Sequence, residues 1–100
     1  MFFHRSGGGG SWLLVGLGNP GAKYASTRHN MGFLALDGLA DREGFRFNKL
    51  RFRAWTAQWK VGDQQVLVMK PQTYMNLSGE SVGEAARFYK IPADHVLVIS

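Results

Sequence analysis

The length of 100 residues suits a single domain, and a content of 45% hydrophobic and 19% charged residues excludes a mainly disordered or collagen-like protein. The absence of cysteine excludes a disulfide framework and a thiolate zinc site, so we expect a reducing, cytoplasmic location. Twelve Lys and Arg residues against seven Asp and Glu residues give a net charge of +5, which favours an anionic partner whose binding depends on salt.

The first segment, residues 1–11, is expected to be a flexible leader. Its second half reads Ser-Gly-Gly-Gly-Gly-Ser, a composition that offers no large side chains for packing. The leader lacks the apolar run of a signal peptide, and no later stretch approaches the ~18 apolar residues that a membrane span needs. We therefore expect residues 12–100 to form one folded domain that has no membrane partner.

The first predicted elements are a strand and a helix. The apolar run over residues 12–17 predicts a buried strand, because the turn residues 18–21 follow it directly. A helix is then expected from Thr27 or a neighbour to about Glu43, with Gly44 placed for the C-terminal cap. The helical spacing predicts a buried face formed by Met31, Leu34, Ala35, Gly38 and Leu39.

The middle of the chain changes to the period of a strand. Residues 45–61 alternate with period two, which places Phe52, Ala54 and Thr56 on one face of a strand. The residues expected on the other face are Arg51, Arg53, Trp55, Ala57, Trp59 and Val61. A turn at Gly62 and Asp63 predicts an antiparallel return over residues 65–70, which Pro71 ends.

The last predicted elements are a second helix and a final strand. The helix begins near Asn76 or Ser78 and runs to Lys90. Its expected buried residues are Val82, Ala85, Ala86 and Tyr89. The aliphatic run over residues 96–99 is typical of a central strand covered on both faces.

The predicted order of strand, helix, hairpin, helix and strand indicates the α/β class. We expect a single domain with a mixed, mostly parallel twisted sheet flanked by helices. A central strand that is the last element needs a neighbour on its other edge, so the sequence resembles the front part of a longer fold.

The glycine loop after the first strand, Gly16-Leu17-Gly18-Asn19-Pro20-Gly21, matches a dinucleotide-binding pattern. In that pattern the glycines open a helix and an acidic residue ends the second strand. Here a turn follows the glycines, and the acids at the right separation, Asp37 and Asp41, lie inside the predicted helix. We therefore expect no nucleotide cofactor; the alternative is a tight turn with structural glycines.

Three polar clusters follow elements whose ends should meet at one edge of the sheet: Asn19, residues 27–30 and residues 74–76. His29 lies near the start of a helix, where positive partial charge favours the neutral imidazole that a general base needs. The alternative is that His29 is an ordinary polar residue of the first turn. The three histidines are too widely spaced to predict a metal site, and no nucleophilic Cys or Ser motif is present, so the pattern favours a base that activates water beside neutral amides.

These residues resemble a known family. Residues 15–21, Tyr24, residues 27–30 with Gly32, and residues 70–79 are similar in identity and spacing to the signature segments of bacterial peptidyl-tRNA hydrolase, and the resemblance runs in order through residues 12–100. It implies an esterase that releases a peptide from tRNA in the cytoplasm without a cofactor or metal, acting as a monomer on the 3′ end and acceptor arm of peptidyl-tRNA.

The resemblance also implies roles for individual residues. His29 would be the base that activates water, and Asn19 would recognise the peptide part of the substrate. The residues implied to line the site for the tRNA end are Tyr24, Tyr74 and Asn76, and Met75 would shape the peptide groove. The two tyrosines could instead be core aromatics.

The chain also departs from the family pattern. Members carry an aspartate just after the strand that matches residues 96–99, where it orients the histidine, and a later asparagine in a glycine-rich segment; both positions lie beyond Ser100. A second hypothesis is therefore a non-catalytic RNA-binding protein on the same scaffold. The basic run over residues 49–53 would serve tRNA phosphates under the resemblance, or it is simply a solvated strand face.

Overall fold

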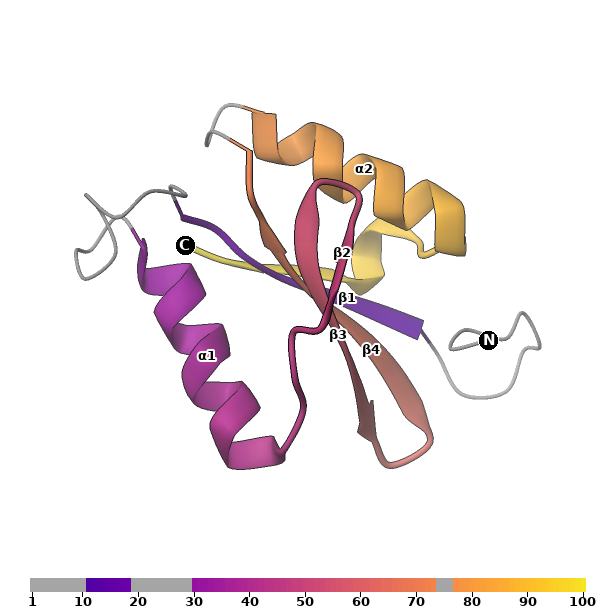
Figure 1. Cartoon of the computed structure of the whole chain (residues 1–100). Helices are drawn as coiled ribbons and strands as arrows, with labels where there is room; N and C mark the ends of the chain where they lie inside the picture. Colours follow the sequence, from indigo (N-terminus) through magenta and orange to yellow (C-terminus); the bar gives the residue numbers. More distant parts are fainter. Residues whose placement is uncertain (1–10, 19–29, 74–76) are drawn as a thin grey trace.

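A computed structural model describes residues 11–18, 30–73 and 77–100 of the chain. Within them the elements are β1 (Ser11–Gly16), α1 (Met31–Glu43), β2 (Lys49–Arg51), β3 (Ala54–Val61), β4 (Gln64–Pro71), α2 (Ser78–Tyr89), the short 3-10 helix η4 (Ala93–His95) and β5 (Val96–Ile99). The strands form one sheet in the order β2-β3-β4-β1-β5 (Figure 1). The predicted mixed α/β sheet is confirmed.

Strand β1 lies inside the sheet and is parallel to both of its neighbours, β4 and β5. Strand β3 is antiparallel to both of its neighbours, β2 and β4. The two pairs of connections differ for a physical reason: short turns join β2 to β3 and β3 to β4, whereas the parallel strands are joined through helices. Three strands therefore end at the same edge of the sheet, which we call the carboxyl edge.

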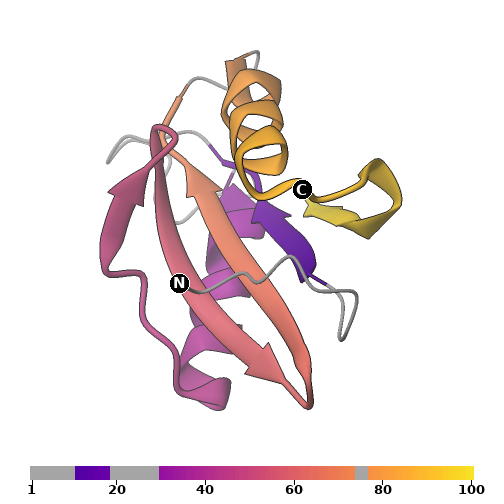
Figure 2. The ribbon, with the colours of Figure 1, turned by 90° about the vertical axis from the view of Figure 1, so that its right-hand side faces the viewer.

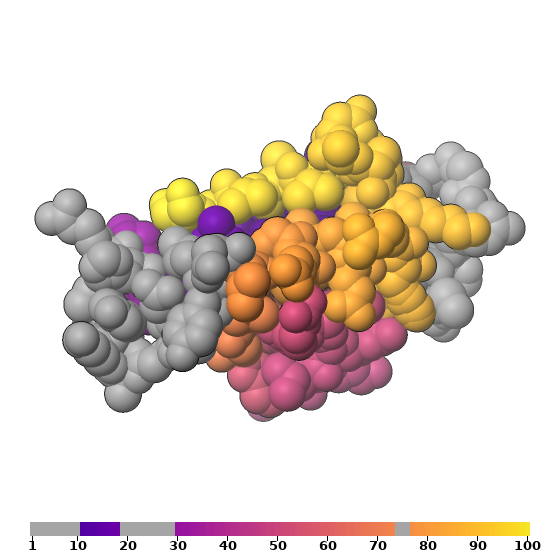
Figure 3. Space-filling model, turned by 90° about the horizontal axis from the view of Figure 1, so that it is seen from above, coloured from indigo at the N-terminus to yellow at the C-terminus, as the bar shows by residue number. Residues whose placement is uncertain are grey.

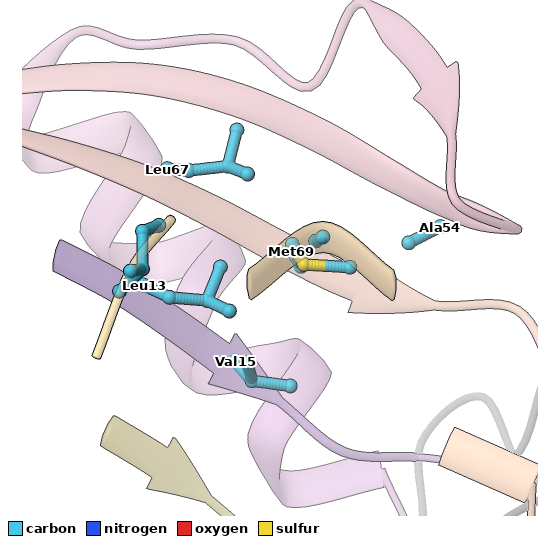
Figure 4. Close-up of a cluster of buried hydrophobic side chains, with 7 residues drawn as sticks. Leu13, Val15, Ala54, Leu67 and Met69 are labelled. Carbon is cyan, nitrogen blue, oxygen red and sulfur yellow. The ribbon is translucent and has the colours of Figure 1, made fainter. Parts of the chain in front are cut away.

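The helices cover opposite faces of the sheet (Figures 1 and 2). On the α2 face, Leu13 and Val15 of β1 pack with Leu67 and Met69 of β4 and with Ala85 of α2 (Figure 4). On the α1 face, the alternate strand residues Val66 and Val68 pack with Leu36 and Ala40 of α1. Because strand residues point alternately to the two faces, each strand contributes to both cores.

Helix α1 has the predicted end but not the predicted buried face. Gly44 adopts the left-handed conformation (φ 79°) and caps the helix through its N–H to the oxygen of Ala40, as expected. The buried residues are Gly32, Leu36 and Ala40, whereas Met31 and Leu34 are 52% and 45% exposed. The predicted buried face was wrong because Gly32, which has no side chain, lies at the closest contact between the helix and the ends of the strands, and this contact sets which residues of the helix are buried.

The single alternating strand predicted over residues 45–61 was also wrong. A tight turn at Phe52 and Arg53 divides it into β2 and β3, and both turn residues adopt positive φ values of 55° and 56°. Arg51 consequently pairs with Ala54 and lies on the same face of the sheet. The turn was invisible in the sequence because glycine or asparagine usually occupies these left-handed positions.

The remaining elements agree with the sequence apart from the position of β5. Strand β1 begins at Ser11, the last residue of the expected leader, and the rest of that leader lies outside the described residues. In α2, Ala85 is buried as predicted and Tyr89 is partly buried. Strand β5 was predicted to be a central strand of a longer fold; among the described strands it lies at the edge of the sheet, where Leu97 and Val98 are 53% and 54% exposed.

Candidate active site

The ends of the three parallel strands meet at the carboxyl edge. The backbone N–H of Leu17, just after β1, donates a hydrogen bond of 2.8 Å to the oxygen of Ile99 at the end of β5. On the other side of β1, the pairing of Val15 with Met69 brings the end of β4 to the same edge. Open α/β sheets bind their ligands at this edge, which makes it the candidate site.

The N-terminus of α1 is pressed against the same edge through two glycines. A Cβ atom on Gly32 would lie 2.4 Å from the oxygen of Ile99 and 2.4 Å from the nitrogen of Leu17. A Cβ atom on Gly16 would lie 2.5 Å from the oxygen of Gly32. Any side chain at either position would therefore push the helix away from the strands, because such distances are too short for real Cβ contacts.

Asn30 connects this helix start to the end of β1. It occupies the N-cap position of α1 and is only 5% exposed. A Cβ atom on Gly18 would lie 2.7 Å from the Oδ1 atom of Asn30, so the two residues are in direct contact. Gly18 and Asn30 are the neighbours in sequence of Asn19 and His29. The N–H groups at the start of a helix carry positive partial charge, which α1 directs toward this corner of the edge.

The end of β4 is held by contacts to both sides of the sheet. Lys70 Nζ lies 2.6 Å from a carboxylate oxygen of Asp37 on α1 and 4.2 Å from the centre of the Phe47 ring. Gln72 donates its backbone N–H to the oxygen of Arg53 in the β2–β3 turn, at 2.8 Å. These contacts fix the backbone immediately before residues 74–76.

Two buried hydroxyl groups flank residues 74–76. Within the described parts of the chain, Thr73 Oγ1 and Ser78 Oγ make no hydrogen bond although both atoms are buried. Both lie beside the segment for which the sequence predicts substrate-binding residues.

All six residues predicted to form the site lie outside the described residues, namely Asn19, Tyr24, His29, Tyr74, Met75 and Asn76. Their placement and roles therefore stay predictions. The structure brings together the described ends from which these segments depart: Gly18 meets Asn30, and β4 lies beside β1.

Sequence reasoning missed three features of this edge. The close contact of Gly16 with Gly32 could have been suspected from two glycines on elements that cross. The Lys70–Asp37 ion pair had no local signal, because the two residues are 33 positions apart. The contact between Gln72 and the β2–β3 turn could not be expected while that turn itself was unrecognised.

The described residues hold no group of three or more side chains that could bind a metal ion. None of their helices is both long and apolar enough to cross a membrane.

The chain matches the family model for peptidyl-tRNA hydrolase over residues 13–100. It is 59% identical over 87 residues to a peptidyl-tRNA hydrolase of Rhizobium johnstonii, covering 86% of this chain and 36% of that protein. It is 54% identical over 88 residues to a chloroplastic peptidyl-tRNA hydrolase of Arabidopsis thaliana, covering 88% of this chain and 31% of that protein.

The fold agrees with this relationship. A crystal structure of peptidyl-tRNA hydrolase from Acinetobacter baumannii superposes with a TM-score of 0.80 at 41% identity, covering 87% of this chain and 45% of that one. The chain thus spans well under half the length of the relatives that it matches. Sequence, family model and fold agree that the chain belongs to the peptidyl-tRNA hydrolase family.

Proposed function

We propose that this chain takes part in hydrolysing the ester bond that joins a peptide, or an N-blocked aminoacyl group, to the 3′ end of tRNA. The observation that carries the proposal is the direct contact of Gly18 with Asn30 at the carboxyl edge, because these residues precede and follow the segment that contains Asn19 and His29. The family membership adds the substrate, since the relatives are peptidyl-tRNA hydrolases.

In this proposal His29 acts as the general base. A position next to the N-cap of α1 favours a neutral imidazole, which can accept a proton from water as the water oxygen attacks the ester carbonyl carbon. The tetrahedral intermediate collapses by breaking the bond to the ribose oxygen, and that oxygen takes up the proton as tRNA leaves. Products are a peptide with a free carboxylate and a tRNA with a free terminal hydroxyl.

The neighbouring polar residues supply recognition. Asn19 offers amide donors and an acceptor without charge, which suits the backbone of a peptide and would separate peptidyl from free aminoacyl substrates. Tyr24, Tyr74 and Asn76 line the site for the tRNA end, where an aromatic ring can stack on an unpaired base. Met75 shapes the groove for the peptide. We also infer a monomeric protein in the cytoplasm, which the absence of cysteine supports.

The test compares two histidines that differ in position. His29→Gln should reduce release of the labelled peptide from N-acetyl-aminoacyl-tRNA by about 10² to 10⁴, the usual contribution of a general base. His95→Gln is the matched control, because His95 stacks on Trp12 with 4.0 Å between ring centres and contacts Ser11 at the amino end of β1. Equal rates for the two variants would refute the role of His29.

Binding of tRNA, measured alongside by fluorescence anisotropy, decides between the enzyme and a non-catalytic RNA-binding protein. The enzyme proposal expects wild-type cleavage and retained tRNA binding in His29→Gln. Binding without any cleavage, even by a wild-type chain extended past Ser100, would refute the enzyme and leave the RNA-binding protein.

A further inference from the structure

A hollow lies on the α2 face of the sheet. It has a volume of about 230 Å³ and lies between the β2–β3 hairpin and the end of α2. Thr56 and Gln58 of β3 and Leu67 of β4 form its floor, and Tyr89 forms the wall on the α2 side. The hollow extends along the sheet: Leu67 lies four residues before the end of β4, whereas Arg51 pairs with Ala54, which pairs with Pro71 at the end of β4.

The charged side chains around this hollow are all positive. Arg46, Lys49 and Arg51 line it, and none of the described lining residues is acidic. Among the described residues, no carboxylate forms an ion pair with any of the three. Three unbalanced cations around one concave surface concentrate a positive potential that attracts anions.

Arg53, which belongs to the same basic run in the sequence, behaves differently. Its guanidinium group lies 3.6 Å from Glu80 and 3.7 Å from Glu84 of α2. The basic run over residues 49–53 is thus divided by the turn: Lys49 and Arg51 face the hollow, whereas the charge of Arg53 is balanced by α2. Figure 3 shows α2 and the hairpin side by side on this face.

Arg51 is held in place before any ligand arrives. It donates a hydrogen bond of 2.7 Å to the hydroxyl of Tyr89, and its guanidinium carbon lies 4.9 Å and 5.0 Å from the centres of the Phe52 and Phe88 rings. A guanidinium fixed in this way loses less side-chain freedom on binding, and its planar donors match the oxygens of a phosphate group.

We propose that this hollow, whose described lining includes none of the residues predicted to carry out hydrolysis, binds a backbone phosphate of RNA. Its volume is several times the ~30 Å³ of one water molecule, so a phosphate group can enter with part of its hydration shell. The exposed ring of Phe88, 52% accessible beside Arg51, offers a stacking surface for an unpaired base, which a free phosphate ion would not use. The identity of the RNA as the tRNA part of the substrate rests on the proposed function.

The test compares the salt dependence of RNA binding by two variants with the same change of net charge. A fluorescent RNA hairpin with a single-stranded 3′ end is titrated at several KCl concentrations. Lys49→Gln should reduce the slope of log K against log salt by about 0.7 to 0.9, the loss of one phosphate contact. Arg53→Gln should leave the slope unchanged, because Glu80 and Glu84 already balance that charge.

Equal slopes for Lys49→Gln and Arg53→Gln would overturn the proposal, since they would indicate an effect of net charge alone. An unchanged melting temperature of Lys49→Gln checks that this exposed substitution leaves the fold intact. If Lys49→Gln does not fold, Arg46→Gln is used in its place and must reduce the slope of log K against log salt by the same amount. No slope change for the folded variant refutes the site.

NMR separates RNA from free phosphate as the source of the anion. Amide signals of Asn48 and Thr56 should shift with the RNA hairpin at concentrations at which inorganic phosphate has no effect. Shifts with inorganic phosphate and none with RNA would overturn the proposal. Ester cleavage of an N-acetyl-aminoacyl adenosine is measured separately, so that loss of the proposed hydrolysis with an intact salt slope refutes the enzyme alone.

Discussion

Replacing Gly32 with alanine is expected to lower the free energy of unfolding by about 2 kcal/mol. The new Cβ atom would lie 2.4 Å from the oxygen of Ile99, and contacts under 3.0 Å do not occur, so α1 must move by more than half an ångström. Overpacking against backbone costs about 1 to 3 kcal/mol, and strain on the Leu17–Ile99 hydrogen bond adds to it. The higher helix propensity of alanine offsets only about 0.5 to 1 kcal/mol of this loss of stability.

Gly38→Ala in the same helix is the matched control. Nothing lies within 4 Å of a Cβ atom at Gly38, so this variant gains the propensity alone and should be more stable by about 0.5 to 1 kcal/mol. Urea unfolding measures both, and 1 kcal/mol corresponds to roughly 4 to 8 °C in melting temperature for a chain of this size. If Gly32→Ala proved as stable as Gly38→Ala, the close helix–strand contact inferred here would be refuted.

The β2–β3 turn and the end of α2 give two further predictions. Ser81→Ala removes the hydroxyl that donates a hydrogen bond to the backbone oxygen of Phe52, and it should lower the free energy of unfolding in urea by about 1 to 3 kcal/mol. Ser78→Ala is the control and should lower it clearly less, because the Ser78 hydroxyl has no partner within the described residues. Equal losses of stability would contradict the role of the Ser81 hydrogen bond. Lys90→Gly should raise the melting temperature by a few degrees, because Lys90 caps α2 with a φ of 57° that glycine adopts without strain; a lower melting temperature would contradict this.

The existence of the helices and strands followed from the sequence. Apolar runs over residues 12–17 and 96–99 are strands within one or two positions, and Gly44 ends α1 as expected. These signals are local: hydrophobic periodicity and residues suited to a left-handed cap act within a few positions of the chain. They define the type of an element without defining its neighbours.

The order of the predicted elements indicated that three polar clusters meet at one edge of the sheet, but the roles of most individual residues came only from the family resemblance. The residues named for the candidate site are distributed over segments far apart in the sequence, and periodicity carries no information about which segment ends will meet. The structure contributes the meeting of those ends: Gly18 lies against Asn30, and β1 lies between β4 and β5. The six predicted side chains themselves stay predictions.

What the sequence determined by itself was therefore the class of fold, the type and approximate position of most elements, and the family. Tertiary structure decided three things: the buried face of α1, the turn at Phe52 and Arg53, and the division of the basic run. The physical reason is the same in each case. A glycine allows close approach only where another backbone arrives, and a left-handed turn of ordinary residues persists only where groups such as Ser81 and Gln72 hold its carbonyl oxygens.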